Sequence, residues 1–425
     1  MGATKTICLL SRSAIPDDPR VRRQGDAFYA AGWKVHAFGL PGGRSDPPVW
    51  MASQTEHDTA AQAAASQGFL RRTQLFESLL SGRMGRILRR VRALPRYLLA
   101  AVSHDYALRM PWTFSHTRDI YRGAAEVNAD IWLANDWYML PVATRLAAER
   151  GGAVVYDSHE FATQQYEKNL RWRCLQRPIV KATESRYIGK AALVSTVSNG
   201  IAEALQSLYG IEKPLVVRSM PAYQQIPFRA TGKKIRVLYH GGVTSIRKLE
   251  EMIDSVPLWR PEFSLTIRGP GAAEYIASLE ARIRNLGLQE RVTLVPPVPM
   301  TALVEEASAF DVGLFAYGGS SPQKQYVLPN KFFEYIMAGL ALCVSDLPEM
   351  SALVRQRDLG VLIDGFEPQA IANAVNTLTP ETIDGYRRNA LAAAQDLCWE
   401  TEGQRLVEAC AAVAGGREAT RAMRA

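Results

Sequence analysis

The sequence contains few cysteines and no long hydrophobic run, and both shortages exclude classes of protein. Its five cysteines are scattered over 425 residues, without a Cys-x-x-Cys pair or a Cys/His cluster. This spacing argues against structural zinc and a disulfide framework, and it fits a reduced cytosol. No stretch approaches the roughly 20 apolar residues that a transmembrane helix requires. The short apolar run that ends at Leu10 is followed at once by Ser11-Arg12-Ser13, so we expect no signal peptide. A soluble or peripheral cytoplasmic protein is therefore predicted.

Acidic residues are outnumbered by basic ones, and the formal net charge is +8. Such a balance is typical of proteins with anionic partners, and also of merely soluble basic proteins. Eight arginines and one acid lie between Arg71 and Arg96, with leucines at helical spacing. Residues 71–98 are therefore predicted to form a basic amphipathic helix, which either binds an anionic membrane surface or packs on its own domain. We expect no nucleic-acid partner.

Short continuous apolar runs alternate with amphipathic segments along most of the chain. Buried parallel strands have this pattern, so we expect an α/β protein with doubly wound, Rossmann-like sheets. Residues 219–234, which contain Pro, Gln and Lys, interrupt the pattern and are interpreted as a linker. The predicted strands are Thr6–Leu10, Val35–Leu40, Ile131–Ala134, Val154–Asp157, Leu193–Val197, Leu215–Val217, Ile235–Tyr239, Ser264–Ile267, Val292–Leu294, Val312–Phe315, Ala341–Ser345 and Gly360–Ile363.

The linker divides the chain into two predicted domains, residues 1–220 and residues 233–394. We expect these domains to face each other across a cleft. In open α/β sheets, ligands bind at the carboxyl ends of the strands, so polar residues that follow strands are candidates for the site.

The most informative stretch is LPNKFFEYIMAGL, residues 328–340. Residues 330–338 are predicted to form a short helix with Asn330 as its N-cap. Glu334 then lies one turn into the helix, where its two oxygens suit the diol of a ribose. The helix N-terminus, with Lys331 beside it, suits phosphate. Without further context, such a carboxylate is more often a surface cap.

This stretch resembles the donor-site segment of retaining glycosyltransferase family 4, whose members have the GT-B fold. The resemblance implies that Asn330, Lys331 and Glu334 bind a nucleotide-sugar donor, with Glu334 on its ribose. Many members carry a second glutamate eight positions earlier, where this sequence has Tyr326. The contact with the transferred sugar is then expected to come from the Gln323–Leu328 loop.

A glycine pair follows the first strand of the second domain, in the run HGGVTSIRK that ends at Lys248. Gly241 and Gly242 allow the backbone to approach a ligand, and a helix is predicted to begin near Lys248. The run resembles the pyrophosphate-binding element of the family, which implies that Arg247 and Lys248 neutralise the leaving diphosphate in catalysis. Gly269, after the next strand, is interpreted as part of a turn that shapes the nucleotide site.

Polar segments after three strands of the first domain resemble the acceptor-side segments of the family. They contain the runs DPRVRR, ANDW and YDSHE. The substrate-binding candidates in them are Arg20, Asp136 and Glu160. His159 is predicted to touch the transferred sugar, although without the resemblance a cap or core histidine is the more frequent case.

The resemblance implies transfer of a sugar from a UDP- or GDP-sugar to a glycan or lipid-linked glycan, with retention of anomeric configuration. The expected setting is bacterial cell-envelope or exopolysaccharide assembly at the inner face of the membrane. Residues 45–118 are then the variable insertion that selects the acceptor, and a last helix at about 395–425 packs back on the first domain. No Asp-x-Asp occurs in the sequence, so we expect neither a metal nor a cofactor besides the nucleotide sugar.

Two alternatives to this function stay open. A nucleotide-sugar 2-epimerase of the same fold would share the diphosphate and ribose sites but need no acceptor. A non-enzymatic protein that binds a membrane surface through residues 71–98 would need no donor site.

Overall fold

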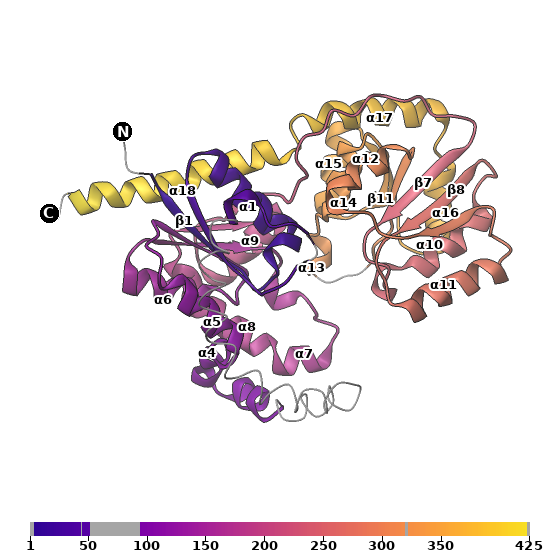
Figure 1. Cartoon of the computed structure of the whole chain (residues 1–425). Coiled ribbons are helices and arrows are strands. Elements are labelled where there is room, and N and C mark those ends of the chain that lie inside the picture. Colours follow the sequence, from indigo (N-terminus) through magenta and orange to yellow (C-terminus); the bar gives the residue numbers. More distant parts are fainter. Residues whose placement is uncertain (1–3, 44, 52–93, 319–321, 423–425) are drawn as a thin grey trace. The chain divides into compact units, whose positions relative to one another are not determined.

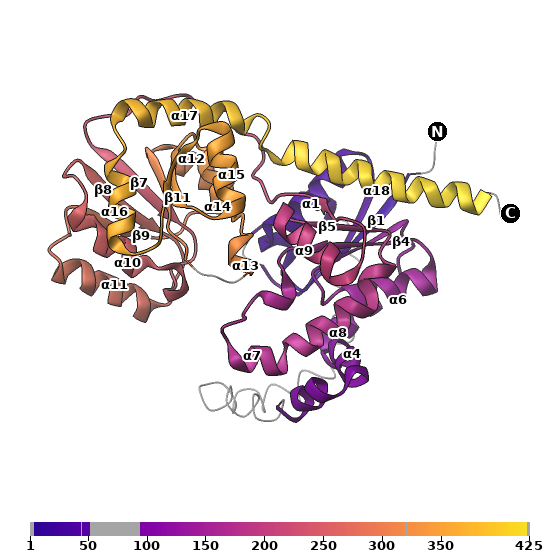
Figure 2. The ribbon, with the colours of Figure 1, turned by 180° about the vertical axis from the view of Figure 1, so that it is seen from behind.

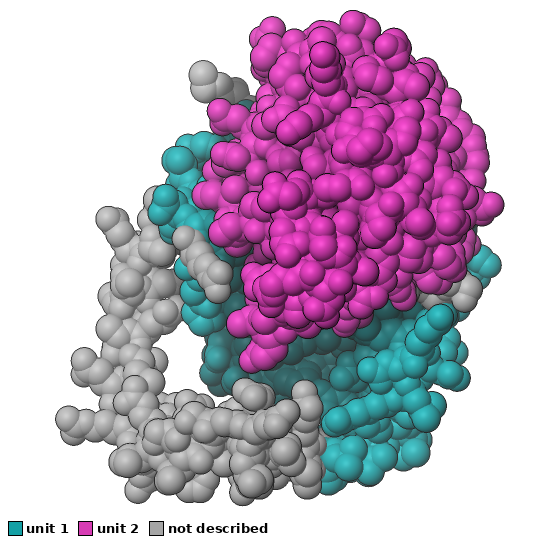
Figure 3. All heavy atoms as spheres, turned by 90° about the vertical axis from the view of Figure 1, so that its right-hand side faces the viewer, with its two compact units in different colours: residues 1–196, 201–216, 403–425 teal, residues 197–200, 217–402 magenta. Residues whose placement is uncertain are grey.

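The computed structural model describes residues 4–43, 45–51, 94–318 and 322–422, which form two compact units (Figures 1 and 2). Unit 1 comprises residues 1–196, 201–216 and 403–425, and unit 2 comprises residues 197–200 and 217–402 (Figure 3). Residues 52–93 lie outside the described ranges. They include most of the predicted arginine-rich helix at residues 71–98 and the middle of the predicted insertion at residues 45–118. Membrane binding by this segment therefore stays a prediction. The described residues 94–102 are helical.

Unit 1 is built on a six-stranded parallel sheet with the order β2-β1-β3-β4-β5-β6. The central strands β3 and β4 are buried from end to end, as their continuous apolar runs predict. The strands are β1 (Thr6–Leu10), β2 (Lys34–Phe38), β3 (Ile131–Asn135), β4 (Ala153–Ser158), β5 (Leu193–Thr196) and β6 (Leu215–Val216).

Unit 2 repeats this architecture with a second six-stranded parallel sheet of order β12-β11-β10-β7-β8-β9. Its strands are β7 (Ile235–His240), β8 (Phe263–Arg268), β9 (Val292–Val295), β10 (Val312–Phe315), β11 (Ala341–Ser345) and β12 (Gly360–Ile363). Every predicted strand is present, within about two residues of its predicted bounds.

Helices connect the strands in both units (Figure 1). Before the linker they are α1 (Pro19–Ala30), α4 (His104–Thr113), α5 (Ser115–Ala124), α6 (Leu140–Arg150), α7 (Leu170–Leu175), α8 (Arg177–Tyr187) and α9 (Asn199–Tyr209). After it they are α10 (Leu249–Ser255), α11 (Ala273–Asn285), α12 (Leu303–Ser308), α13 (Pro322–Gln325), α14 (Asn330–Met337), α15 (Pro348–Arg357), α16 (Pro368–Asn376), α17 (Pro380–Ala394) and α18 (Trp399–Ala422). None of the helices described is both long and apolar enough to cross a membrane.

The last helix, α18, belongs to unit 1 from Gly403 onward. There the Nζ atom of Lys5, just before β1, donates to the carbonyl oxygen of Ala411 at 3.3 Å. Cys410 on the same helix is fully buried. The end of the chain is thus part of the packing of the unit that its beginning forms.

Of the two expectations about helix starts, one is wrong in detail. Asn330 is not an N-cap but the first residue of α14, and Pro329 occupies the cap position without a side-chain hydrogen bond. Proline suits this place because its dihedrals there are extended and it has no amide to leave unpaired. The prediction that a helix begins near Lys248 is confirmed, because Lys248 is the N-cap residue of α10, in a left-handed conformation with φ of 59°. It separates α10 from a single 3-10 turn that ends at Arg247.

Candidate functional site

The glycine loop after β7 lies against the loop after β8. The amide of Gly241 donates to the carbonyl oxygen of Arg268 at 3.0 Å, and the amide of Val243 donates to that of Pro270 at 2.8 Å. Gly269 has no room for a side chain, because its Cβ would lie 1.9 Å from the Gly241 oxygen and its φ is +152°. The glycines therefore allow two backbone loops to approach each other at the carboxyl edge of the sheet.

Lys331, in the first turn of α14, brings a buried amine to this loop. The residue is 6% exposed, and among the described residues its Nζ atom has no hydrogen-bond partner. This atom lies 3.8 Å from the centre of the Tyr239 ring, and a Cβ on Gly241 would come within 2.7 Å of it. Burial and then the charge of Arg247 lower the pKa of Lys331 well below its usual range, while Glu334 opposes them. An anion that accepts a hydrogen bond from this amine would remove the free-energy cost of burying the amine without a partner.

Glu334 lies one turn further along α14 and is also buried. Its Oε2 atom is 2.9 Å from Nε2 of His240, the last residue of β7. The His240 ring stacks on Tyr335, whose hydroxyl accepts a hydrogen bond from the His240 amide at 3.0 Å. The structure therefore brings the candidates Lys331, Glu334 and the Gly241 loop together, and Asn330 is half-buried at the helix start. His240 was missed, although its place between a strand and the glycine pair could have indicated it.

The two predicted cations, Arg247 and Lys248, differ in what they contact. The Nζ atom of Lys248 donates to Glu251 Oε1 at 2.5 Å and lies 5.2 Å from the Phe366 ring centre. Arg247 has no carboxylate partner within the described part of the chain, and its guanidinium lies 5.6 Å from the Tyr317 ring centre. Arg247 is thus the available member of the pair, whereas Lys248 is already neutralised.

Asp157, at the end of β4, is a fully buried carboxylate surrounded by donors. Arg20 donates from Nε at 2.6 Å and from Nη2 at 2.7 Å, and Gln24 and Ser195 donate at 2.7 Å each. Burial alone would raise the pKa of Asp157, but Arg20 and His159 outweigh it and hold this pKa well below its usual range. Arg20 was predicted to bind substrate. It is 5% exposed and directs its fork at Asp157, which favours a positioning role.

His159 lies between two carboxylates at the ends of β3 and β4. Its Nε2 atom is 3.0 Å from both Asp157 Oδ2 and Asn135 Oδ1, and its Nδ1 atom is 3.4 Å from Asp136 Oδ2. Burial would lower the pKa of His159, but Asp136 and Asp157 outweigh it and raise this pKa to about 9. The ring is therefore a protonated donor at neutral pH. Asp136 has φ of 64°, and such strained residues gather at functional sites. Glu160 is half-buried.

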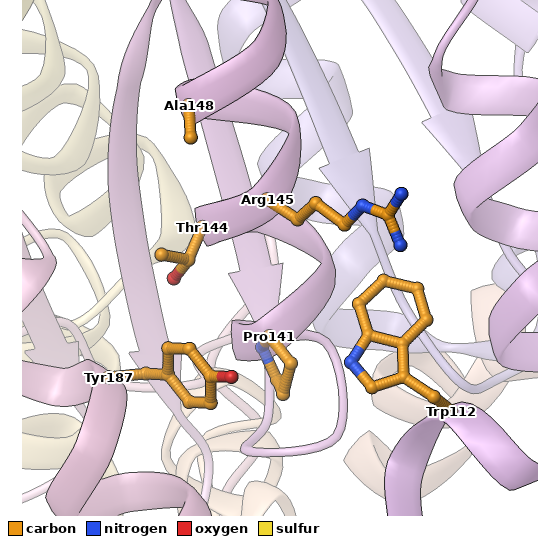
Figure 4. Close-up of a pocket in the computed structure, with 6 residues that line it drawn as sticks. All are labelled: Trp112, Pro141, Thr144, Arg145, Ala148 and Tyr187. Carbon is orange, nitrogen blue, oxygen red and sulfur yellow. The ribbon is translucent and has the colours of Figure 1, made fainter. Parts of the chain in front are cut away.

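A surface hollow of about 320 Å³ lies elsewhere in unit 1 (Figure 4). None of the predicted site residues lines it, and its lining comes from α4, α6 and α8: Trp112, Pro141, Thr144, Arg145, Ala148 and Tyr187. Arg145 is paired with Glu149 at 2.8 Å, so the hollow offers no unpaired cation. Among all the residues described, no three His, Cys, Asp or Glu side chains are grouped so that they could hold a metal ion.

Comparisons with known proteins agree with this architecture. Residues 234–380 match the family model of glycosyl transferases group 1. HepE from Anabaena, solved in complex with UDP-glucose, is 15% identical, with 96% of this chain and 99% of that chain covered and a TM-score of 0.65. Sucrose-phosphate synthase from Thermosynechococcus elongatus is also 15% identical, with 95% and 98% covered and a TM-score of 0.66. A glycosyltransferase from Rickettsia africae is 11% identical, with 97% and 99% covered and a TM-score of 0.62. None of the curated proteins matches this chain.

The two parallel six-stranded sheets with flanking helices match those of GT-B glycosyltransferase structures. The chain is therefore a two-domain α/β protein with the GT-B fold. Within it, the segment that matches glycosyl transferases group 1 contains the Gly241 loop, Lys331 and Glu334.

Proposed function

We propose that this protein is a glycosyltransferase that moves a sugar from a nucleotide-diphosphate sugar to an acceptor, with retention of anomeric configuration. The buried Lys331 amine, which has no hydrogen-bond partner among the described residues, carries the proposal. The diphosphate of the donor would supply that partner, and Glu334 would accept hydrogen bonds from the ribose. The match of residues 234–380 to glycosyl transferases group 1 and the UDP-glucose complex of HepE support this assignment.

The proposed reaction runs without a metal or a cofactor besides the nucleotide sugar. The bond between the anomeric carbon and the diphosphate breaks, and its electron pair stays on the diphosphate. The acceptor oxygen bonds to the same face of the sugar, and its proton passes to the leaving diphosphate. Arg247 and Lys331 would stabilise the charge that develops there. His159, as an imidazolium, would donate a hydrogen bond to a hydroxyl of the transferred sugar.

UDP or GDP is the proposed nucleotide of the donor, and a glycan or lipid-linked glycan is the proposed acceptor. The proposed setting is cell-envelope or exopolysaccharide assembly on the cytoplasmic side of the membrane. The +8 net charge of the chain favours such anionic molecules as ligands.

A calorimetric screen of UDP- and GDP-sugars against wild type, Glu334→Ala and a control variant tests the proposal. Loss of charged hydrogen bonds to a ribose costs about 1.5–3 kcal/mol each, so Glu334→Ala should bind donor at least tenfold more weakly. Glu274, exposed on α11 of the same unit, gives the control Glu274→Ala, which should bind like wild type.

Three outcomes of the screen would change the assignment. No binding of any nucleotide sugar by the wild-type protein would overturn the proposed function. Equal donor affinity in a folded Glu334→Ala protein would remove Glu334 from the site. Conversion of the donor to its 2-epimer without an acceptor would show the epimerase alternative to be the correct one.

A further inference from the structure

An arginine without an acidic partner lies at the carboxyl edge of the unit 1 sheet. Arg12 follows β1, and its guanidinium lies 4.2 Å from the Tyr138 ring centre and 5.1 Å from the Phe114 ring centre. It is half-buried, and no carboxylate in the described ranges pairs with it. By contrast, the buried Arg20 and Arg387 both pair with aspartates. Two aromatic rings therefore hold the Arg12 charge in place without neutralising it.

The ring of Phe114 lies at the start of α5, and this helix start contributes two further polar groups. No side chain among the described residues caps the first amides of this helix. His116, in its first turn, stacks on Phe114 with ring centres 5.4 Å apart. The Nε2 atom of His116 is buried and lacks a hydrogen-bond partner within the described chain. Burial and then Arg12 lower the pKa of His116, so its ring is neutral at neutral pH.

The acidic side chains of α5 and of the segment that contains Tyr138 are already paired. Asp119 on α5 pairs with Arg122 at 3.3 Å, and Asp136 lies 3.4 Å from His159. The charge of Arg12 is therefore uncompensated, beside an unused imidazole nitrogen and the positive end of a helix. The Arg12 guanidinium and the first amides of α5 can donate to a negatively charged oxygen, and the His116 Nε2 atom can do so in the tautomer that carries its proton there.

We infer that Arg12, His116 and the first turn of α5 bind an oxyanion carried by the acceptor, either a phosphate or a carboxylate. The Arg12 guanidinium would donate two parallel hydrogen bonds to two oxygens of the anion. The rings of Phe114 and Tyr138 would flank the part of the acceptor next to the anion. The assignment to the acceptor rests on the proposed function. It follows from position, because Tyr138 comes two residues after Asp136, at the strand ends where His159 lies.

Binding of three soluble probes, octyl phosphate, octyl glucuronide and octyl glucoside, tests this inference. The titrations are run below the micelle concentration. They contain saturating UDP or GDP, whichever the wild type binds, so that the donor site of unit 2 stays filled. Wild type should bind at least one anionic probe, and Arg12→Ala should bind it at least tenfold more weakly. Arg12→Lys should recover part of the affinity, because the charge remains and the fork is lost. Preference for the phosphate or for the glucuronide identifies the oxyanion.

The matched control is Arg145→Ala. Arg145 lies over the ring of Trp112 (Figure 4) and over that of Tyr121. Unlike Arg12, it is neutralised by a carboxylate, that of Glu149. This variant should bind the anionic probes like wild type, and Arg12→Ala should bind UDP like wild type. Wild-type affinity of Arg12→Ala for both anionic probes would overturn the inference, as would equally tight binding of the neutral octyl glucoside by wild type. Failure of wild type to bind either UDP or GDP would instead contradict the proposed function.

Discussion

At the scale of single residues, the two cations that follow the glycine loop should differ in catalysis. Arg247→Ala should lower kcat about a hundredfold, and more than it weakens donor binding, because charge on the leaving diphosphate develops only in the transition state. Arg247→Lys should recover part of the rate. Lys248→Ala is the control, since Lys248 is already bound to Glu251, and its kcat should change only a few-fold. Steady-state kinetics on the folded variants measure these effects.

A rise of the donor KM alone in Arg247→Ala, with turnover intact, would contradict this prediction. Arg247 would then bind only the ground state of the donor, and the catalytic role would have to pass to Lys331 or to the loop amides.

The charge of His159 depends on Asp157 and Asp136. Asp157→Asn should lower the pKa of His159 from about 9 toward its ordinary value, because a carboxylate 3.0 Å from Nε2 is lost. Since the folded pKa is raised, the stability that this charge contributes is complete below the unfolded pKa and is lost as pH rises through about 9. Titration of the imidazole signals by NMR measures the shift, with Asp119→Asn as the control. An unchanged His159 pKa in Asp157→Asn would show that Asp157 does not hold this proton.

At the scale of elements, β4, α8 and α9 meet at one buried carboxyl group. Tyr156 on β4 and Tyr209 on α9 each donate to Glu184 on α8 at 2.7 Å. Burial raises the pKa of Glu184 from 4.5 to about 7, although both tyrosines oppose this. The group therefore contributes its full stability below pH 4.5, and this contribution is lost as pH rises through about 7. At about 1.4 kcal/mol per pKa unit, the loss is about 3 kcal/mol.

Glu184→Gln should remove this part of the pH dependence, because its neutral amide offers one oxygen that accepts from one tyrosine hydroxyl and an NH2 group that donates to the other. Urea unfolding of wild type and variant between pH 4.5 and 8 measures the difference. Parallel stability curves for the two proteins would show that Glu184 is ionised throughout this range in the folded state.

At the scale of the whole molecule, the proposed transfer uses cations of the chain instead of a metal. Arg247 and Lys331 would neutralise the leaving diphosphate, so activity should survive exhaustive chelation with EDTA and should not rise with magnesium or manganese. Initial rates with the donor found in the nucleotide-sugar screen measure this. Activity that falls with EDTA and returns with either ion would show the metal-free mechanism to be wrong.

The sequence by itself determined the strands and their division into two α/β units. A buried parallel strand requires a continuous apolar run, which is a local property of the sequence. Each run therefore indicated one strand of one of the two sheets. The same holds within the Gly241 loop and within α14. The residues of each are adjacent in the chain, so their spacing follows from a single strand end or a single helix. The sequence therefore named Lys331, Glu334 and the Gly241 loop as candidates, and the structure shows that they lie together.

Only the tertiary structure decided which of the predicted groups are available to a ligand. Arg20 is occupied because Asp157, 137 residues away in the chain, lies opposite it, whereas Arg247 meets no such acid among the described residues. His240 belongs to the candidate site only because α14 places Glu334 2.9 Å from its ring. The partner of a charge depends on long-range packing, and no local pattern of residue types encodes it.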